Sequence, residues 1–521
     1  MDARPVGLPC RLTAREIDVL TLLTAGLSNT EIGARLSASP RTVSTHVEHI
    51  LAKLGQSSRT GAAALAVERG YLRLPLPGRG PVPAGLAVCQ LHRLAAGERS
   101  AQGHGTGPGD VVGPGWPEPG RPGRRRPGEH ALRIGSAFPL TGPAADDGRQ
   151  MRNGSALAVA EINARGGIGG RLVEQVVVDA DIFSADGIGR AFGQLFDADV
   201  DAVTSGYVFA EGAAARLAAR YGAPYVHATT SQTLAETVRE NRAAYANVFQ
   251  VCPTEVHYGP GFIRFLDAET ARGWRPPSRS IAFVDTDLPS GQLAGQPTLD
   301  AAGRSGWRVA ALHRVPAIGA DWEFLISELE RIEPAAVMIA QFLAGELAAF
   351  QRLAAGRLPR TLIYAIYAPS VPEFLQAAGA SAEGVVWATV TGTYGDSIGR
   401  RFRADYASSY GRAPGWSHAG IAYDEVHLLA RSWMAAGRPR DFGAVCGELR
   451  RLRYRGVNGS YVLDNAEQSG LCFPDSTPDP SLGQAHLVLQ VQDGAHRIIG
   501  PEPYAQARFR PPGSRPGGQG W

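Results

Sequence analysis

A glycine- and proline-rich segment, residues 75–130, most constrains how this 521-residue chain can fold. It holds 13 glycines and 10 prolines among 56 residues, more than twice the density of the remaining chain. Such a segment buries too little apolar surface to offset the entropy lost on ordering it. We therefore predict a flexible linker that separates an N-terminal head, residues 1–74, from a larger C-terminal region. Residues 511–521 are predicted to form a disordered tail.

The composition bounds the class of protein. Hydrophobic residues make up 44% and charged residues 19% of the chain, which supports sizeable cores and excludes global disorder. No run approaches the roughly 18 apolar residues of a membrane-spanning helix, so we expect no membrane partner. The first residues lack a basic segment followed by an apolar one. We therefore expect no secretion signal and a cytoplasmic location.

The distribution of the charges and of the cysteines limits the partners and the kinds of site that we expect. The formal net charge is +3, but residues 1–74 hold nine basic and six acidic residues, and residues 75–130 hold seven and four. The basic excess therefore lies in the first quarter, where a nucleic-acid partner is expected. The five cysteines are scattered and form no CxxC pair. Their pattern indicates neither a zinc site nor a disulfide framework.

Four short helices are predicted in the head. Apolar residues recur at helical spacing over residues 17–27, and Ser28-Asn29-Thr30-Glu31 is a capping box that starts a second helix. A third helix, residues 39–55, begins with Ser-Pro and ends with glycine, and a fourth spans residues 59–69. Two short helices joined by a tight turn are typical of a helix-turn-helix, whose second helix enters a major groove about 12 Å wide. The alternative is a four-helix module for protein contacts.

The order of motifs in the head resembles a known DNA-binding family. The motifs are Leu12-Thr13-Ala14-Arg15-Glu16, Gly26-Leu27-Ser28-Asn29-Thr30-Glu31-Ile32, Thr42-Val43-Ser44-Thr45-His46-Val47, Lys53-Leu54-Gly55 and Arg59-Thr60. The series resembles the LuxR-type (GerE-like) helix-turn-helix family over residues 9–72. The resemblance implies transcriptional control through double-stranded DNA, with the fourth helix supplying the contact of a homodimer.

The same resemblance implies the DNA contacts. The recognition helix is expected at residues 41–53, and the contacts are expected from Thr30, Arg41, Thr42, Ser44, Thr45 and Lys53. The family often has lysine in place of Ser44 and a basic or neutral residue in place of Glu48. Because a carboxylate that faces phosphates is repulsive, we expect a reduced affinity for DNA and a reduced salt dependence. His46 is interpreted as a partly buried residue of the inner face.

From residue 131 onward, short apolar strands alternate with helical stretches. The predicted strands are Leu132–Phe138, Leu172–Asp179, Ala202–Ser205, Pro224–Ala228, Ser280–Val284, Arg308–Arg314, Ala336–Ala340, Thr361–Ala365 and Gly384–Ala388. This alternation is typical of parallel βαβ units. Because about 380 residues exceed one such sheet, the predicted fold class is multidomain: an all-α head plus an α/β sensor with two lobes and parallel sheets, residues 131–510.

Motifs of common enzymes give no support for catalysis. The chain has no HExxH and no GxxxxGK[ST] sequence. The run Gly166-Gly167-Ile168-Gly169-Gly170 follows a predicted helix and precedes a predicted strand, the reverse of a dinucleotide-binding fingerprint. It therefore predicts a helix end and a tight turn. We expect no enzymatic activity, no cofactor and no metal.

The C-terminal region also resembles a known family. Ile134-Gly135 to Leu140-Thr141-Gly142 is followed by Asn153-Gly154, Ala158-Val159, Glu161-Ile162-Asn163 and the glycine run. The order resembles type I periplasmic-binding-protein folds, specifically the branched-chain amino-acid/amide/urea receptors, over roughly residues 131–505. Gly500-Pro501-Glu502-Pro503-Tyr504, after an expected antiparallel pair, looks most like the cytoplasmic amide sensors of aliphatic amidase operons. The resemblance implies a small polar ligand, an amide, urea or an amino acid, held between two hinged lobes.

Carried over one position at a time, the resemblance implies eight ligand-binding residues. They are Tyr207, Phe209, His227, Thr229, Thr230, Glu255, Phe342 and Tyr367. Glu255 falls where amino-acid receptors place the acid that pairs with the ligand ammonium, whereas amide sensors lack a charge there. Residues 285–290 lack the tyrosine of amide sensors. For Tyr207, Phe342 and Tyr367 the alternative is packing between the lobes, and for Glu255 it is a solvated loop charge.

Together these features predict a one-component transcription regulator, in which a ligand closes the sensor and modulates DNA binding by the head. Because a flexible linker transmits strain poorly, we expect coupling through a homodimer of the sensor, which changes the effective concentration of the two heads. One alternative is a substrate-binding protein of an ABC transporter with a vestigial or misjoined head. Another is an amidase-operon type sensor that acts on a protein or RNA.

Overall fold

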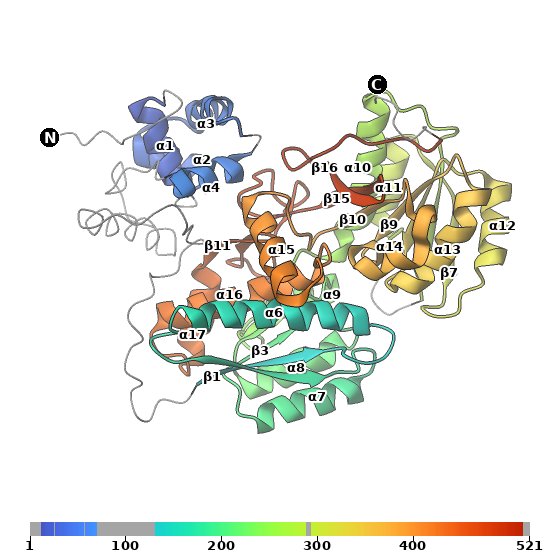
Figure 1. Ribbon diagram of the computed structural model, residues 1–521. Coiled ribbons are helices and arrows are strands. Elements are labelled where there is room, and N and C mark those ends of the chain that lie inside the picture. The colour runs from blue at the N-terminus through green and yellow to red at the C-terminus, as the bar shows by residue number, and fades with distance from the viewer. Residues whose placement is uncertain (1–11, 25–26, 57, 70–130, 288–292, 514–521) are drawn as a thin grey trace.

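The structure is a computed structural model (Figure 1). It describes residues 12–24, 27–56, 58–69, 131–287 and 293–513. The predicted linker and residues 514–521 of the predicted tail lie outside these residues, so both predictions stay untested. Within the described ranges, no helix combines the length and the apolar character needed to cross a bilayer.

Four helices form the head. They are α1 (Ala14–Thr24), α2 (Asn29–Leu36), α3 (Pro40–Leu54) and α4 (Arg59–Arg69). The capping box is confirmed, because the Ser28 hydroxyl accepts from the Glu31 N–H and the Glu31 carboxylate accepts from the Ser28 N–H. Ser39 caps α3 in the same way, and Gly55 ends it with a φ of 62°. Ser37, whose φ of 54° ends α2, and Ser39, which caps α3, fix the turn between the two helices, and this turn sets the recognition helix on the small apolar core of the head.

Two β-sheets define the two lobes. Lobe 1 has the strand order β2-β1-β3-β4-β5, and lobe 2 has β16-β15-β10-β9-β8-β6-β7. The strands of lobe 1 are β1 (Leu132–Phe138), β2 (Val173–Asp179), β3 (Ala202–Ser205), β4 (Tyr225–His227) and β5 (Val248–Gln250). Those of lobe 2 are β6 (Ser280–Thr286), β7 (Arg308–Val315), β8 (Ala336–Ala340), β9 (Leu362–Ile366), β10 (Val386–Thr389), β15 (Leu487–Gln492) and β16 (Ala495–Gly500). All pairs are parallel except β10 with β15 and β15 with β16.

Every predicted strand is confirmed to within two residues at each end, and so is the expected antiparallel pair near the C-terminus. Strand β5 was not predicted, because Val248–Gln250 is too short to show a pattern of its own. The hairpin of β11 (Arg453–Gly456) and β12 (Gly459–Val462) was also missed, as were β13 (Cys472–Phe473) and β14 (Gln484–Ala485).

Helices cover both sheets. Lobe 1 has α6 (Ala145–Ala164), α7 (Ala185–Asp197), α8 (Glu211–Tyr221) and α9 (Gln232–Glu240), and lobe 2 has α10 (Tyr258–Ala271), α11 (Gln296–Arg304), α12 (Trp322–Ile332), α13 (Ala344–Arg357) and α14 (Pro372–Ala378). The later helices α15 (Ser397–Tyr410), α16 (His418–Ala436) and α17 (Phe442–Arg451) return to lobe 1, where α16 lies beside α6 (Figure 1). The two helices meet at Gly154, where a Cβ atom would lie 2.0 Å from the Ala419 carbonyl oxygen.

The chain passes between the lobes three times. The first crossing follows β5 and includes the short helix η1 (Glu255–His257), the second follows β10, and the third joins β12 to β13. The first and third crossings lie side by side, because the Gln250 N–H donates to the Gln468 carbonyl at 3.0 Å and the Gly470 N–H donates to Gln250 at 2.9 Å. Paired crossings of this kind form a hinge between two otherwise separate cores.

The glycine run ends α6 and turns the chain into β2, as predicted. Gly166, Gly167, Gly169 and Gly170 all have positive φ angles. A Cβ atom on Gly167 would lie 2.0 Å from the Arg171 carbonyl oxygen, so the turn requires glycine there.

Candidate functional site

A cavity lies between the lobes, at the carboxyl ends of parallel strands from both sheets. It encloses about 870 Å³ of space, part of it open to solvent. The loop after β3 contributes Tyr207 and Phe209, and the loop after β4 contributes Thr229 and Thr230. Open α/β sheets bind their ligands at such loops. The cavity is therefore the candidate ligand site.

Seven of the eight predicted ligand residues line this cavity. They are Tyr207, Phe209, Thr229, Thr230, Glu255, Phe342 and Tyr367. His227 is not among the described residues of the lining. It has no exposed surface, and its ring stacks on Tyr225 with 4.9 Å between centroids. Burial lowers the pKa of His227 to about 3, so this side chain is a neutral part of the sheet packing.

The two lobes touch through aromatic side chains. Phe209 of lobe 1 meets Phe342 of lobe 2 edge to face, with 5.6 Å between ring centroids. Phe342 in turn stacks on Tyr367 at 5.8 Å. The Thr230 and Tyr367 hydroxyls share a hydrogen bond of 2.8 Å across the cleft. The two lobes are therefore in contact, and these aromatic residues both pack the lobes together and line the cavity.

Tyr367 has a strained backbone. Its φ of 59° and ψ of −61° fall in a region that non-glycine residues rarely adopt. Such strain costs roughly 1–3 kcal/mol and persists only where the surroundings enforce it. Here the surroundings are the bond to Thr230 and the ring of Tyr258, whose centroid lies 5.0 Å from that of Tyr367.

The Thr229 hydroxyl is engaged with the neighbouring loop. It accepts from the Val208 N–H at 3.0 Å and donates to the Gly206 carbonyl at 3.4 Å. A hydroxyl has a single proton to donate, so Thr229 holds the loop that carries Tyr207 and Phe209. To donate to a ligand carboxylate, the Thr229 hydroxyl would first have to break its hydrogen bond to the Gly206 carbonyl.

Two acidic groups face the cavity. Glu255 is half-buried in η1, and one of its oxygens accepts from the Gln232 N–H at 2.8 Å. Burial raises the pKa of Glu255 to about 7, against the opposing effect of that backbone bond. Asp147, in the first turn of α6, was not predicted: it accepts from the Tyr207 hydroxyl and lies 3.5 Å from His418 Nε2. Burial raises the pKa of Asp147 as well.

No lysine or arginine lines the cavity among the described residues. In the described lining only His418 can carry a positive charge, and it lies beside Asp147, so the half-buried Glu255 carboxyl favours a positively charged group in the ligand. The signal for Asp147 in the sequence was the pair Asp146-Asp147 at the start of a helix that follows a sheet strand. Its proximity to Tyr207 depends on tertiary structure and could not be predicted.

An apolar pocket continues the cavity outward. Phe183 of lobe 1 and Ile318 of lobe 2 line it together with Phe209 and Phe342, which also line the inner cavity. Phe183 is 41% exposed and Ile318 is 60% exposed, which is high for such apolar residues. The mouth of the cleft is therefore apolar on both sides.

The recognition helix α3 exposes only some of the predicted DNA-contacting residues. Thr30 of α2 is exposed, and so are Arg41, Thr42, Thr45 and Lys53 of α3. The half-buried Ser44 hydroxyl accepts from the Asn29 amide at 2.9 Å. Lys53 donates to both carboxylate oxygens of the buried Glu16, at 2.7 and 2.8 Å, so it joins α3 to α1. His46 is half-buried, in agreement with its prediction.

Arg59 at the start of α4 is a buried cation of the head, as is Arg35 in α2. Arg59 is 7% exposed and donates to the Asn29 side-chain oxygen and to the Leu27 carbonyl. Because Asn29 also donates to Ser44, these three residues connect α4, α2 and the recognition helix. The sequence analysis did not assign Arg59 this role.

One enzyme-like motif was overlooked in the sequence. Gly395-Asp396-Ser397-Ile398-Gly399 matches the GxSxG pattern of serine hydrolases. That pattern requires a serine in a sharp turn between a strand and a helix. Here Asp396 caps α15, Ser397 is the first residue of the helix, and β10 has ended at Thr389. The motif is therefore a helix N-terminus and gives no support for catalysis.

Comparisons with known proteins identify both parts of the chain. Residues 131–470 match the family described as "Periplasmic binding protein". Residues 11–66 match the family described as "Bacterial regulatory proteins, luxR family".

Solved structures support the assignment of the larger part. The chain is 31% identical to a putative branched-chain amino acid ABC transporter from Silicibacter pomeroyi, with a TM-score of 0.68, covering 74% of this chain and 99% of that one. A leucine binding protein LivK from Thermotoga maritima shares the fold, with 19% identity and a TM-score of 0.58, covering 71% of this chain and 98% of that one.

Curated relatives match the head alone. The transcriptional regulatory protein YhcZ from Bacillus subtilis is 53% identical over 58 residues, which are 11% of this chain and 27% of that one. The putative HTH-type transcriptional regulator Mb0914c from Mycobacterium bovis is 51% identical over 59 residues, 11% of this chain and 7% of that one. The match thus spans less than a third of either relative. The chain belongs to the periplasmic binding protein family and carries an N-terminal helix-turn-helix head of the luxR family.

Proposed function

We propose that this protein is a one-component transcription regulator of double-stranded DNA, controlled by a small ligand with an ammonium group in the cleft. Among an amide, urea and an amino acid, this chemistry favours an amino acid. The observation that carries the proposal is the Glu255 carboxyl, half-buried in a cavity whose described lining holds no lysine or arginine and whose one histidine, His418, lies beside Asp147. The proposal places the protein in the cytoplasm with its DNA, as a homodimer.

The cavity chemistry supports this ligand class. Burial removes water from the Glu255 carboxylate. An ammonium group of the ligand would interact with that carboxylate in place of the lost water, so the site should bind a cation more tightly than a neutral amide. Phe209, Phe342 and Tyr367 offer apolar surface for the remainder of the ligand. The outer pocket beside Phe183 is apolar and adjoins the cavity, so an apolar side chain of the ligand could extend into it.

The contact between the lobes supports a closure mechanism. A ligand that bridges Glu255 of the hinge and Tyr367 of lobe 2 would favour the contacting arrangement over the open one. The resulting shift cannot exceed the difference in affinity of the ligand for the two arrangements. In a homodimer, a change of lobe arrangement would change the spacing of the two heads and with it their joint affinity for DNA.

A thermal-shift and calorimetry screen of the full chain tests the ligand class. The panel pairs leucine and phenylalanine with analogues that lack only the amine, 4-methylpentanoate and 3-phenylpropanoate, and adds acetamide, propionamide and urea. A ligand at 100 times its Kd adds about 2.7 kcal/mol of stability. We expect a response to the amines alone, lost in Glu255→Gln and kept in Glu236→Gln, a nearby acid outside the described cavity lining. A response to the amine-free acids or to amides would refute the ammonium assignment.

A second experiment tests regulation. Duplexes selected from a random-sequence pool by the full chain would provide a DNA probe, and its affinity would be measured with and without the ligand found above. We expect a change of at least about fivefold, the lower end of typical allosteric coupling. An unchanged affinity would refute the coupling while leaving DNA binding intact.

The second candidate function is that of a transport substrate-binding protein, favoured by the solved relative that is described as an ABC transporter. Loss of DNA binding in Arg41→Ala, with ligand binding unchanged, supports the regulator. Failure of the whole chain to select any duplex supports the transport function.

A further inference from the structure

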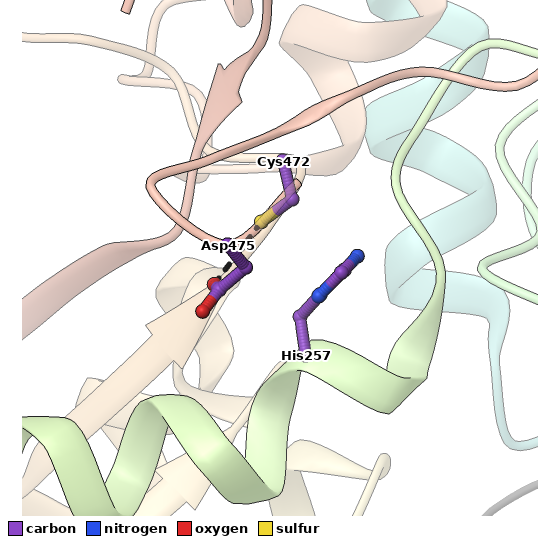
Figure 2. A group of neighbouring side chains, drawn as sticks. All are labelled: His257, Cys472 and Asp475. Atoms are coloured by element: carbon purple, nitrogen blue, oxygen red, sulfur yellow. Dashed lines mark hydrogen bonds between the residues drawn. The ribbon is translucent and has the colours of Figure 1, made fainter. Parts of the chain in front are cut away.

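Side chains that can bind a metal gather at the hinge, outside the described lining of the cleft. His257 closes the first crossing, Cys472 opens β13 after the third crossing, and Asp475 follows in the next turn. One ligand atom of each residue lies within 4.8 Å of those of the other two. Figure 2 shows the three side chains converging between the start of α10 and the loop that follows Cys472. We call these residues, with His486 below, the hinge cluster.

His486 lies beside this group, although it is not one of the residues whose ligand atoms all lie within 4.8 Å of one another. Its Nδ1 atom lies 3.4 Å from Asp475 Oδ2, and Cys472 Sγ lies 3.5 Å from the same oxygen. The His486 ring has no exposed surface, and neither of its nitrogens meets hydrogen-bond geometry with any described residue. A Cβ atom on Gly261 would lie 2.1 Å from the ring, so the backbone of α10 holds it in place. The ring therefore has the Asp475 carboxylate as its neighbour at Nδ1, while Nε2 has no hydrogen-bond partner among the described residues, which indicates a missing partner there.

We propose that the hinge cluster binds one Zn²⁺ ion through His257, Cys472, Asp475 and His486. One thiolate, two imidazoles and one carboxylate form a donor set that suits zinc and not magnesium or calcium. Ligand atoms at about 2.0–2.3 Å in a tetrahedral site lie roughly 3.3–3.7 Å from one another. The distance from Asp475 Oδ2 to His486 Nδ1, 3.4 Å, and that to Cys472 Sγ, 3.5 Å, already fall in this range.

Arg264 prepares Asp475 for this role. It donates to both oxygens of the carboxylate, at 3.2 Å for Oδ2. Although burial opposes ionisation, the contacts with His486 and Arg264 hold the pKa of Asp475 well below its usual range. The Arg264 guanidinium thus favours the ionised form of Asp475, the form that binds a metal. With zinc bound, Arg264 would still donate to Oδ1 of Asp475. The Oδ2 atom of Asp475 and the Cys472 thiolate would face the ion.

Loading the site requires a proton to leave. Burial keeps Cys472 as a thiol, because it raises the pKa of that group well above its ordinary value. Formation of the sulfur–zinc bond releases the thiol proton to water and leaves zinc in its divalent state, so no oxidant or reductant is needed.

A bound ion would restrict movement at the hinge. His257 belongs to the first crossing, while Cys472 and Asp475 follow the third, so the ion would add a link between segments that are already joined by backbone hydrogen bonds and by the Arg264–Asp475 pair. Glu255 lies in the same short helix as His257. This inference does not depend on the proposed ligand or on DNA binding.

The test uses the full chain with any affinity tag removed and with metals stripped by a chelator. Titration with Co²⁺ is expected to give one thiolate-to-cobalt charge-transfer band per chain, together with the strong visible bands of a tetrahedral site. Addition of Zn²⁺ should bleach both, and elemental analysis should find one zinc per chain after dialysis.

Variants decide whether the band comes from the hinge cluster. Cys472→Ser should abolish it, and His257→Gln, at a half-buried site, should weaken Co²⁺ binding by about tenfold or more. Cys446→Ser, another buried cysteine, is the matched control and should leave the band unchanged. Circular dichroism verifies the fold of each variant. The proposal is overturned if no band forms, if the band survives Cys472→Ser, or if His257→Gln and Cys446→Ser bind Co²⁺ as the original chain does.

Discussion

Replacement of Arg59 by methionine is the most decisive test of the head. The change keeps most of the side-chain volume but removes the guanidinium that donates to Asn29 and to the Leu27 carbonyl. Each hydrogen bond from a charged donor contributes about 1.5–3 kcal/mol, so we expect a loss of roughly 3–5 kcal/mol. A domain of this size has a stability of only about 3–9 kcal/mol at 0.05–0.15 kcal/mol per residue. Most of the stability of the head therefore depends on this one side chain.

Pulse proteolysis in urea measures the effect in the full chain. Trypsin cleaves an unfolded head after Arg35, Arg41 or Lys53, and mass spectrometry of those peptides reports on the head alone. With an m-value of about 1 kcal/mol/M for so small a domain, the midpoint should fall by about 3–5 M. Arg41→Met, at an exposed residue of α3, is the matched control and should leave the midpoint unchanged. A midpoint for Arg59→Met within about 0.5 M of the original would refute this role of Arg59.

Three further predictions concern the head, the cleft and the core. Because Lys53 is bound to Glu16, Lys53→Ala should leave the salt dependence of DNA binding unchanged, whereas Arg41→Ala should lower its slope by about 0.9 in fluorescence anisotropy titrations. Tyr367→Phe removes the bond to Thr230, about 1 kcal/mol, and should increase the ligand-free radius of gyration measured by X-ray scattering; an identical radius would contradict the role of that bond. Glu425 has 1% exposure, and neither carboxyl oxygen has a hydrogen-bond partner among the described residues. Burial, with the charge of Asp424, raises its pKa well above the usual value, so it stabilises the fold at low pH and this contribution is lost as pH rises. Glu425→Gln should therefore raise the Tm of the sensor at pH 8 and leave it nearly unchanged at pH 4; equal shifts at both values would contradict this.

Features set by neighbouring residues could be predicted from the sequence. The capping box at Ser28 and the glycine after α3 act within a few residues, and both are confirmed. The strands were found because parallel strands buried on both faces are nearly continuous apolar runs bounded by turn residues. Strand β5 has only three residues and forms by pairing with β4, so no local pattern could reveal it.

The candidate ligand site was predicted because topology places the relevant loops together at the carboxyl ends of the strands. His227 was assigned to the lining, but it shares a face of β4 with Tyr225, where side chains two residues apart point the same way. Asp147 and the hinge cluster depend on contacts between distant segments. The scattered cysteines gave no indication of a metal site. His257, which lies close to Cys472 in the structure, is far away from it in the sequence.

The chain contributes to lobe 1, then to lobe 2 and then to lobe 1 again, and this order matters during synthesis. The apolar core of the head is built from residues 12–66, so it is complete soon after the ribosome has produced them. Lobe 1 stays unfinished until α16 and α17 have emerged, because Val426, Trp433 and Leu449 are part of the core beneath α6. A transcript broken before residue 450, or a chain cleaved there, would release a complete head without a complete sensor. Such a fragment would keep the head and lose the cavity between the lobes, so under the proposed function any DNA binding that it retained would no longer respond to the ligand.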